Sequence, residues 1–149
     1  MIWFNIKKLE RLITTEQFSE KDGYKYVLAN TIYGIVYSIY ISMSGYNTDL
    51  LINAIITLFV TLSLLPLVFE TNSVGDNKDF IKRFFSITWV IQMWVLILSV
   101  AITVLFTFAF DKNDDSLTRR VASWLSTGII NTIFYLLTNQ SFKRINLKE

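Results

Sequence analysis

The sequence predicts an all-α membrane protein, with four transmembrane helices and an N-terminal amphipathic helix that lies in the membrane interface. Two observations support this fold class. Hydrophobic residues make up 52% of the chain and charged residues 17%, against about 25% charged residues in an ordinary soluble domain. The charges are confined to short segments separated by long uncharged ones. Four buried helices of a soluble protein would need polar outer faces, which these segments lack.

Four uncharged segments have about the length that a transmembrane helix needs, roughly 20 residues. They cover residues 27–43, 50–69, 84–110 and 121–137, within a single domain of residues 1–149. The third contains 27 residues, and at about 1.5 Å per residue it would extend about 40 Å. We therefore expect this segment to tilt or to protrude from the bilayer.

The arm of residues 2–18 is predicted to form the interfacial helix. Apolar side chains recur at helical spacing, at Ile2, Ile6, Leu9 and Ile13. Charged side chains are expected on the opposite side, at Lys7, Lys8, Glu10 and Arg11. Ser19 and Asp22 have the spacing of a capping box, which predicts that the first long helix starts there.

The distribution of Lys and Arg predicts that both termini lie in the cytoplasm, in a bacterial-type inner membrane. The N-terminal flank of residues 1–26, the loop before the third segment and the C-terminal tail together contain 11 of the 14 basic residues. The loop between the first two segments contains none. The loop after the third contains Lys112, Arg119 and Arg120, together with three Asp residues. Cytoplasmic flanks carry the excess of Lys and Arg in membrane proteins.

Several function classes are disfavoured by what the sequence lacks. There are no cysteines and no histidines, and no Asp, Glu, Lys or Arg falls within the four apolar segments. Catalytic pairs, proton relays and metal sites generally require such groups. We therefore predict a protein without catalytic activity, cofactor, metal or nucleic-acid partner.

The apolar segments do contain polar uncharged side chains, which are candidates for the bundle core or for the lining of a pore. The strongest are the amides Asn30, Asn53, Gln92 and Asn131. Gly34, Ser38 and Ser42 follow Asn30 at four-residue spacing and form a candidate helix-packing face. One interpretation is helix packing within one chain. The other is a water-filled path or a self-assembly face.

The loop before the third segment is a candidate docking loop for a cytoplasmic partner. Its charged residues are Asp76, Lys78, Asp79, Lys82 and Arg83. Asp79 and Arg83 have the i, i+4 spacing of an ion pair. The alternative interpretation is positive-inside anchoring together with a helix cap.

The stretch 75–89, which ends in Ser86, Thr88 and Trp89, resembles a pattern in small uncharacterised four-span bacterial inner-membrane proteins. It covers about a tenth of the chain and implies no activity. In size and topology the chain is also similar to immunity proteins of pore-forming bacteriocins and to small membrane components of phage defence.

These observations favour a self-associating membrane protein with a defence or stress role, and with the option of forming a channel. Its partners would be the lipid bilayer and further copies of itself, with segment 27–43 or 84–110 at the subunit contact. The alternative is an immunity-type protein that blocks a pore-forming toxin, with another membrane or cytoplasmic protein as its partner. A holin-like protein is less favoured because the tail is not strongly basic. A transporter is less favoured because the segments lack coupling charges.

Overall fold

The computed structural model describes residues 1–43, 48–75, 78–109 and 117–147, and these residues form helices without any strand. The helices are α1 (Ile6–Thr14), α2 (Glu20–Met43), α3 (Thr48–Val74), α4 (Phe80–Ala109) and α5 (Leu117–Asn146). The all-α prediction is confirmed. Each predicted apolar segment coincides with its own long helix, α2 to α5, except that residue 110 lies outside the described residues. Each of these helices extends beyond its segment at one or both ends.

Three of the described helices are long and apolar enough to cross a membrane. They are Thr48–Val74, Phe80–Ile102 and Leu117–Asn146, so the chain has the character of a membrane protein. The remaining long helix, α2, which carries the predicted span 27–43, is not one of these three among the residues that the structure describes. Its first turns carry Lys21, Asp22 and Lys25.

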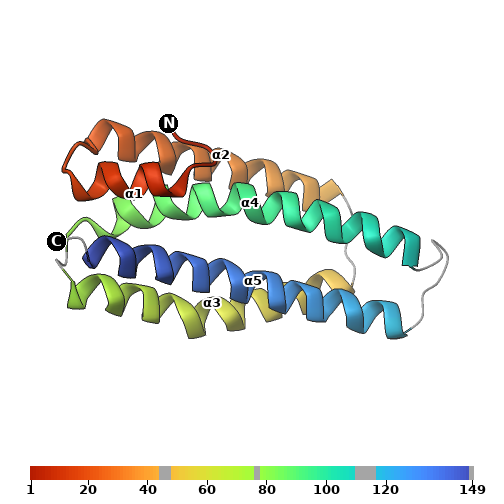
Figure 1. Cartoon of the computed structure of the whole chain (residues 1–149). Helices are drawn as coiled ribbons and strands as arrows, with labels where there is room; N and C mark the ends of the chain where they lie inside the picture. Colours follow the sequence, from red (N-terminus) through yellow and green to blue (C-terminus); the bar gives the residue numbers. More distant parts are fainter. Residues whose placement is uncertain (44–47, 76–77, 110–116, 148–149) are drawn as a thin grey trace.

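The four long helices pack as two pairs. α2 lies along α4, α3 lies along α5, and α4 and α5 join the two pairs. Figure 1 shows the resulting order α2, α4, α5, α3 from top to bottom. Asn131 bonds to Thr57 and Tyr135 to Thr61, so α3 and α5 run in the same direction. The short helix α1 contacts both α4 and α5.

The buried core lies at one end of the molecule, which we call the α1 end. It is formed by α1, the start of α2, the end of α3, the first half of α4 and the second half of α5 (Figure 1). Its apolar members are Leu9, Ile13, Phe18, Tyr26, Val68, Ile87, Trp89, Val90, Ile91, Met93, Tyr135, Phe142 and Ile145. α4 is the central helix, because 39% of its apolar stretch is buried, against 6% in α3 and 11% in α5.

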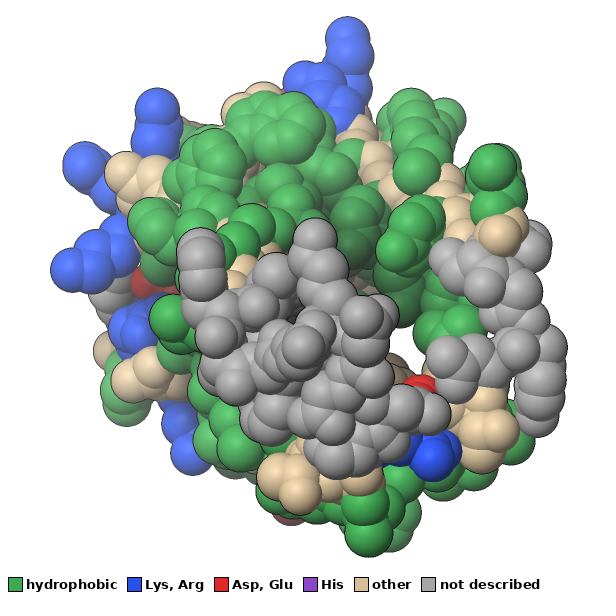
Figure 2. All heavy atoms as spheres, turned by 90° about the vertical axis from the view of Figure 1, so that its right-hand side faces the viewer, with side chains coloured by type: hydrophobic (Ala, Val, Ile, Leu, Met, Phe, Trp, Pro, Cys, Tyr) green, Lys and Arg blue, Asp and Glu red, His purple; other side chains and the backbone are tan. Residues whose placement is uncertain are grey.

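At the opposite end, which we call the far end, apolar side chains point outward. Leu58 is 58% exposed, Val100 57% and Leu125 62%, with many further Leu, Ile and Val residues like them. Viewed along the helices from this end, the described surface is largely hydrophobic, and Lys and Arg side chains project mainly from one side (Figure 2). This outward-facing apolar surface suits lipid rather than water.

Hydrogen bonds at the helix ends explain where α1 and α2 begin. The side chain of Asn5 accepts a hydrogen bond from the Lys8 amide at 2.9 Å and caps α1. The Ser19 hydroxyl accepts from the Asp22 amide at 3.2 Å, which is one of the two bonds of a capping box, and the start of α2 at Glu20 is as predicted. Between them, Glu16 has a φ of 55°, a left-handed conformation that turns the chain from α1 into α2.

Candidate functional site

A buried ion pair attaches α1 to the C-terminal end of α5. The Glu10 side chain is only 1% exposed and accepts a hydrogen bond from the Ser141 hydroxyl at 2.6 Å. Arg144 donates to the same carboxylate from Nη2 at 2.6 Å and from Nε at 3.0 Å. Three side chains from two helices at opposite ends of the chain thus meet in one charge-assisted cluster.

The burial of Glu10 corrects the prediction that it lies on the charged side of the arm. Glu10 follows Ile6 by four residues and precedes Ile13 by three, so the helical period places it on the edge of the apolar face. Leu9 and Ile13, on the same face, are buried at 0% and 6% exposure. A carboxylate within an apolar face is a signal that could have predicted a buried partner.

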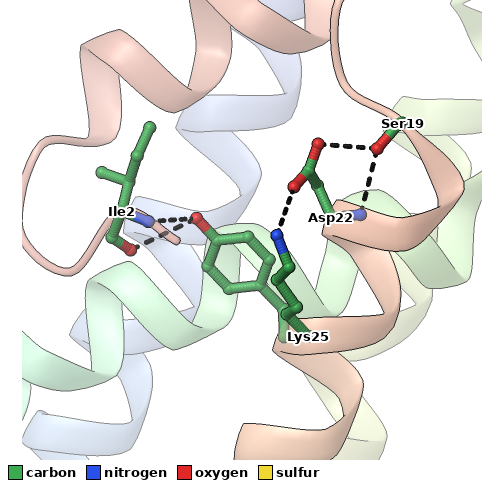
Figure 3. Close-up of polar contacts among 5 residues, drawn as sticks. Ile2, Ser19, Asp22 and Lys25 are labelled. Carbon is green, nitrogen blue, oxygen red and sulfur yellow. Dashed lines mark hydrogen bonds and ion pairs between the residues drawn. The ribbon is translucent and has the colours of Figure 1, made fainter.

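The segment before α1 is held to the bundle by its backbone. The Ile2 amide donates to the Tyr26 hydroxyl at 2.6 Å, and that hydroxyl in turn lies 3.3 Å from the Ile2 carbonyl (Figure 3). The Trp94 indole donates to the Phe4 carbonyl at 3.0 Å. Burial raises the pKa of Tyr26 above its usual value of 10.0. Tyr26 therefore remains a neutral donor and acceptor at physiological pH.

A second polar group surrounds the start of α2. The Ser19 hydroxyl donates to the Asp22 carboxylate at 2.6 Å, and Lys25 donates to it at 3.0 Å (Figure 3). The bonds from Ser19 and Lys25 lower the pKa of Asp22 from 3.8 to about 2. Asp22 is therefore ionised throughout the physiological range. Its negative charge interacts favourably with the positive N-terminal end of the α2 dipole.

The predicted docking loop is partly engaged within the chain. Lys82 pairs with Glu20 at 2.6 Å and with Asp79 at 2.7 Å, so the Asp79 carboxylate has a partner at i+3. A Cβ on Gly23 would overlap the Lys82 side chain, so this glycine permits the close approach of α2 to α4. Arg83 is only 4% exposed. Lys78 is exposed and pairs with Glu16 at 3.6 Å, whereas Asp76 lies outside the described residues.

Two of the four candidate amides bridge helices. Asn30 donates to the carbonyls of Tyr26 at 2.8 Å and Phe85 at 3.1 Å, which joins α2 to α4. Asn131 donates to the Thr57 hydroxyl at 3.2 Å, which joins α5 to α3. The other two, Asn53 and Gln92, are half-buried. The Asn53 carbonyl oxygen is buried without a hydrogen-bond partner among the described residues.

The candidate packing face on α2 points away from the rest of the chain. One turn after Asn30, a Cβ on Gly34 would have no described atom within 4 Å beyond its chain neighbours and the adjacent backbone of its own helix. Ser38 is exposed and donates to the Gly34 carbonyl at 2.8 Å. The side chain of Ser42 lies outside the described part. The polar stripe of α2 therefore contacts α4 at Asn30, whereas its next member, Gly34, points away from α4.

An ion pair that the sequence analysis did not predict joins α3 and α5 at the far end. Arg120 donates to the Asp49 carboxylate at 3.0 Å, and the Trp124 indole donates to the same oxygen at 3.2 Å. The Arg120 guanidinium also lies over the Trp124 ring, 5.6 Å from its centre. Asp49 therefore compensates the charge of Arg120, one of the three basic residues in the loop that the predicted topology places outside the cytoplasm.

Comparisons with protein families, with curated proteins and with solved structures found no match to this chain. Within the described residues, no three His, Cys, Asp or Glu side chains gather as metal ligands would. At the α1 end, the buried Glu10 and Ser141 side chains bond to each other. Ser86, Thr88 and Thr138 instead donate to carbonyls of their own helices. The buried Asn72 side chain and Trp89 indole have no hydrogen-bond partner among the described residues. What this arrangement does chemically is to attach α1 and the preceding segment to the helix bundle.

Proposed function

We propose that the chain spans a bacterial-type inner membrane four times, with both termini in the cytoplasm. At about 1.5 Å per residue, the long helices of 24 to 30 residues reach about 36 to 45 Å. Each could cross the hydrocarbon core of about 30 Å. Both chain ends lie toward the α1 end (Figure 1), where most Lys and Arg residues are found. This arrangement agrees with an even number of crossings and with the excess of basic residues on the cytoplasmic side.

We further propose that the protein acts without catalysis, by assembling with copies of itself, in a defence or stress role. The observation that carries the assembly proposal is the outer face of α2, formed by Gly34, Tyr37 and Ser38. All three are exposed, and Tyr37 is 52% exposed. Small and hydroxyl-bearing side chains on one helix face favour close helix–helix contacts in membranes. A second copy would cover a face that is less suited to lipid than those of α3, α4 and α5.

A channel, if this assembly forms one, would run between copies rather than through one chain. Some hydroxyl and amide side chains of α3 and α5 bond across the pair, as Thr57 does with Asn131. Thr61 and Tyr135 form a second such bond at 3.2 Å. These contacts use the polar stripes for packing within the chain, which leaves the α2 face for an intermolecular path.

The oligomeric state of the purified protein in mild detergent and in nanodiscs tests this proposal. We expect an oligomer that Gly34→Leu or Ser38→Leu weakens without reducing membrane insertion. Ser63→Leu is the matched control, because Ser63 is an exposed serine on α3 that donates to its own helix at 2.8 Å. A protein that stays monomeric in every condition would contradict self-assembly. The immunity-type alternative would then be favoured, with a toxin helix on the same α2 face.

A further inference from the structure

The outer surface of α1 carries a cluster of three cations, Lys7, Lys8 and Arg11, which we call the α1 basic face. The three positions lie within about 100° of one another around the helix, given about 100° per residue. All three side chains are exposed. Leu9, Glu10 and Ile13 occupy the opposite side and are buried against α4 and α5. The packing of α1 therefore determines the direction in which the basic face points.

The charges of this face are not compensated by ion pairs within the described part of the chain. Five other cations of that part do form ion pairs. Lys25, Lys78, Lys82, Arg120 and Arg144 each form an ion pair with a carboxylate. No such pair is formed by the α1 basic face with the residues that the structure describes. The only acidic residue of α1 is Glu10, which is turned inward to Arg144. The face therefore presents three net positive charges.

Two half-exposed aromatic side chains precede this face in the sequence, in the segment that leads into α1. Trp3 is 50% exposed and packs edge-on against Trp89, with ring centres 5.4 Å apart. Phe4 is 51% exposed and packs in the same way on Trp94, at 5.9 Å. Half-exposed Trp and other aromatic rings beside Lys and Arg are typical of the zone where hydrocarbon meets headgroups.

We propose that the α1 basic face binds the headgroups of anionic phospholipids, and this inference rests on the proposed membrane location. The charge complementarity is direct, since three cations face phosphate groups that the chain itself does not provide. Each Lys or Arg close to an anionic membrane surface contributes about 1 kcal/mol, or about fivefold in affinity. The attachment of α1 through Glu10 and Arg144 holds these cations in place.

The test compares the full-length chain with two triple variants in bilayers that contain equal amounts of phosphatidylglycerol and phosphatidylcholine. After mild detergent extraction, native mass spectrometry measures the ratio of the two lipids that remain bound. The α1 variant carries Lys7→Gln, Lys8→Gln and Arg11→Gln. The control removes the same charge from exposed lysines outside α1, with Lys21→Gln, Lys25→Gln and Lys143→Gln.

We expect the unaltered chain to retain phosphatidylglycerol preferentially, and the α1 variant to lose about fivefold or more of this preference. The control should lose less than about twofold, and high salt should weaken the preference of the unaltered chain. Equal losses in both variants, or no preference in the unaltered chain, would overturn the proposal. Resistance to alkaline extraction is measured in parallel. A chain that is released from the membrane would refute the membrane location, whereas an inserted chain without lipid preference would refute only the lipid-binding face.

Discussion

The α1 end and the far end of this molecule contain the same kinds of apolar residue, but the buried core lies at the α1 end. At the α1 end, Leu9, Val68, Ile87 and Phe142 are completely buried. At the far end, side chains such as Leu58 are more than half exposed. Water would oppose such exposure, whereas lipid tails solvate apolar side chains about as well as a protein core does. The comparison teaches that the described chain builds its core where α1 and the segment before it pack onto the long helices.

One substitution at each end tests this comparison, and the substitution at the α1 end should have the largest effect. Leu9→Ala should lower the unfolding free energy by about 3 kcal/mol, because it removes a fully buried side chain and leaves a cavity. Leu58→Ala, at 58% exposure, should change it by less than about 0.5 kcal/mol. Unfolding by SDS titration in mixed micelles measures both. Equal losses would mean that the far end is packed as tightly as the α1 end.

The next effect concerns the ion pair that holds α1. Arg144→Met should destabilise the protein by about 2 kcal/mol, because it leaves the buried Glu10 carboxylate without its cation. This is below the roughly 3–5 kcal/mol of a fully buried pair, since Arg144 is 38% exposed. Adding Glu10→Met should recover much of the loss, as measured by the same titration. A double variant as unstable as the single one would show that the charge at Glu10 is not the cause.

The hydrogen bond that holds the N-terminal segment should have a smaller effect. Tyr26→Phe removes the hydroxyl that bonds to both backbone groups of Ile2. We expect a loss of about 1 kcal/mol and faster hydrogen exchange at the first residues. Mass spectrometry of the N-terminal peptide measures the exchange, and Tyr24→Phe is the control, because Tyr24 is 65% exposed. Unchanged exchange in the Tyr26 variant would argue against this attachment.

A similar loss, of at most about 1 kcal/mol, is expected at the far end from Arg120→Gln. Its ion pair with Asp49 is about one third exposed on both sides, and such pairs contribute little to stability. Fluorescence of Trp124 should nevertheless change, because the indole shares the Asp49 carboxylate. A loss as large as that from Arg144→Met would show that the far end depends on buried polar contacts as the α1 end does.

The smallest effect depends on pH. The pKa of Asp22 falls from 3.8 to about 2 on folding, so its contribution is present above about pH 4 and is lost as pH falls toward 2. The gain is well below 1 kcal/mol, because this group is exposed to solvent. Asp22→Asn should be slightly less stable than the unaltered chain at pH 6 and equally stable at pH 2, by thermal unfolding in detergent. A difference that persists at pH 2 would assign the effect to the cap geometry rather than to charge.

The sequence by itself determined the secondary structure of this protein. Uncharged segments of the required length predicted the cores of α2 to α5, because a helix in lipid satisfies its backbone internally and needs a continuous apolar surface. The capping box at Ser19 predicted the start of α2, because its hydrogen bonds connect residues only three apart. The amphipathic arm contained α1, although the helix proved shorter than the predicted segment 2–18.

Only the tertiary structure decided which residues those helices bring together. Glu10 and Arg144, 134 residues apart, and Asp49 and Arg120, 71 residues apart, meet because α1 packs on α5 and α5 runs beside α3. Helical periodicity defines a face but does not identify the helix that covers it, so the exposure of Gly34 could not be predicted. Pairing depends on the packing of whole helix surfaces, and a local sequence pattern carries no information about the partner surface.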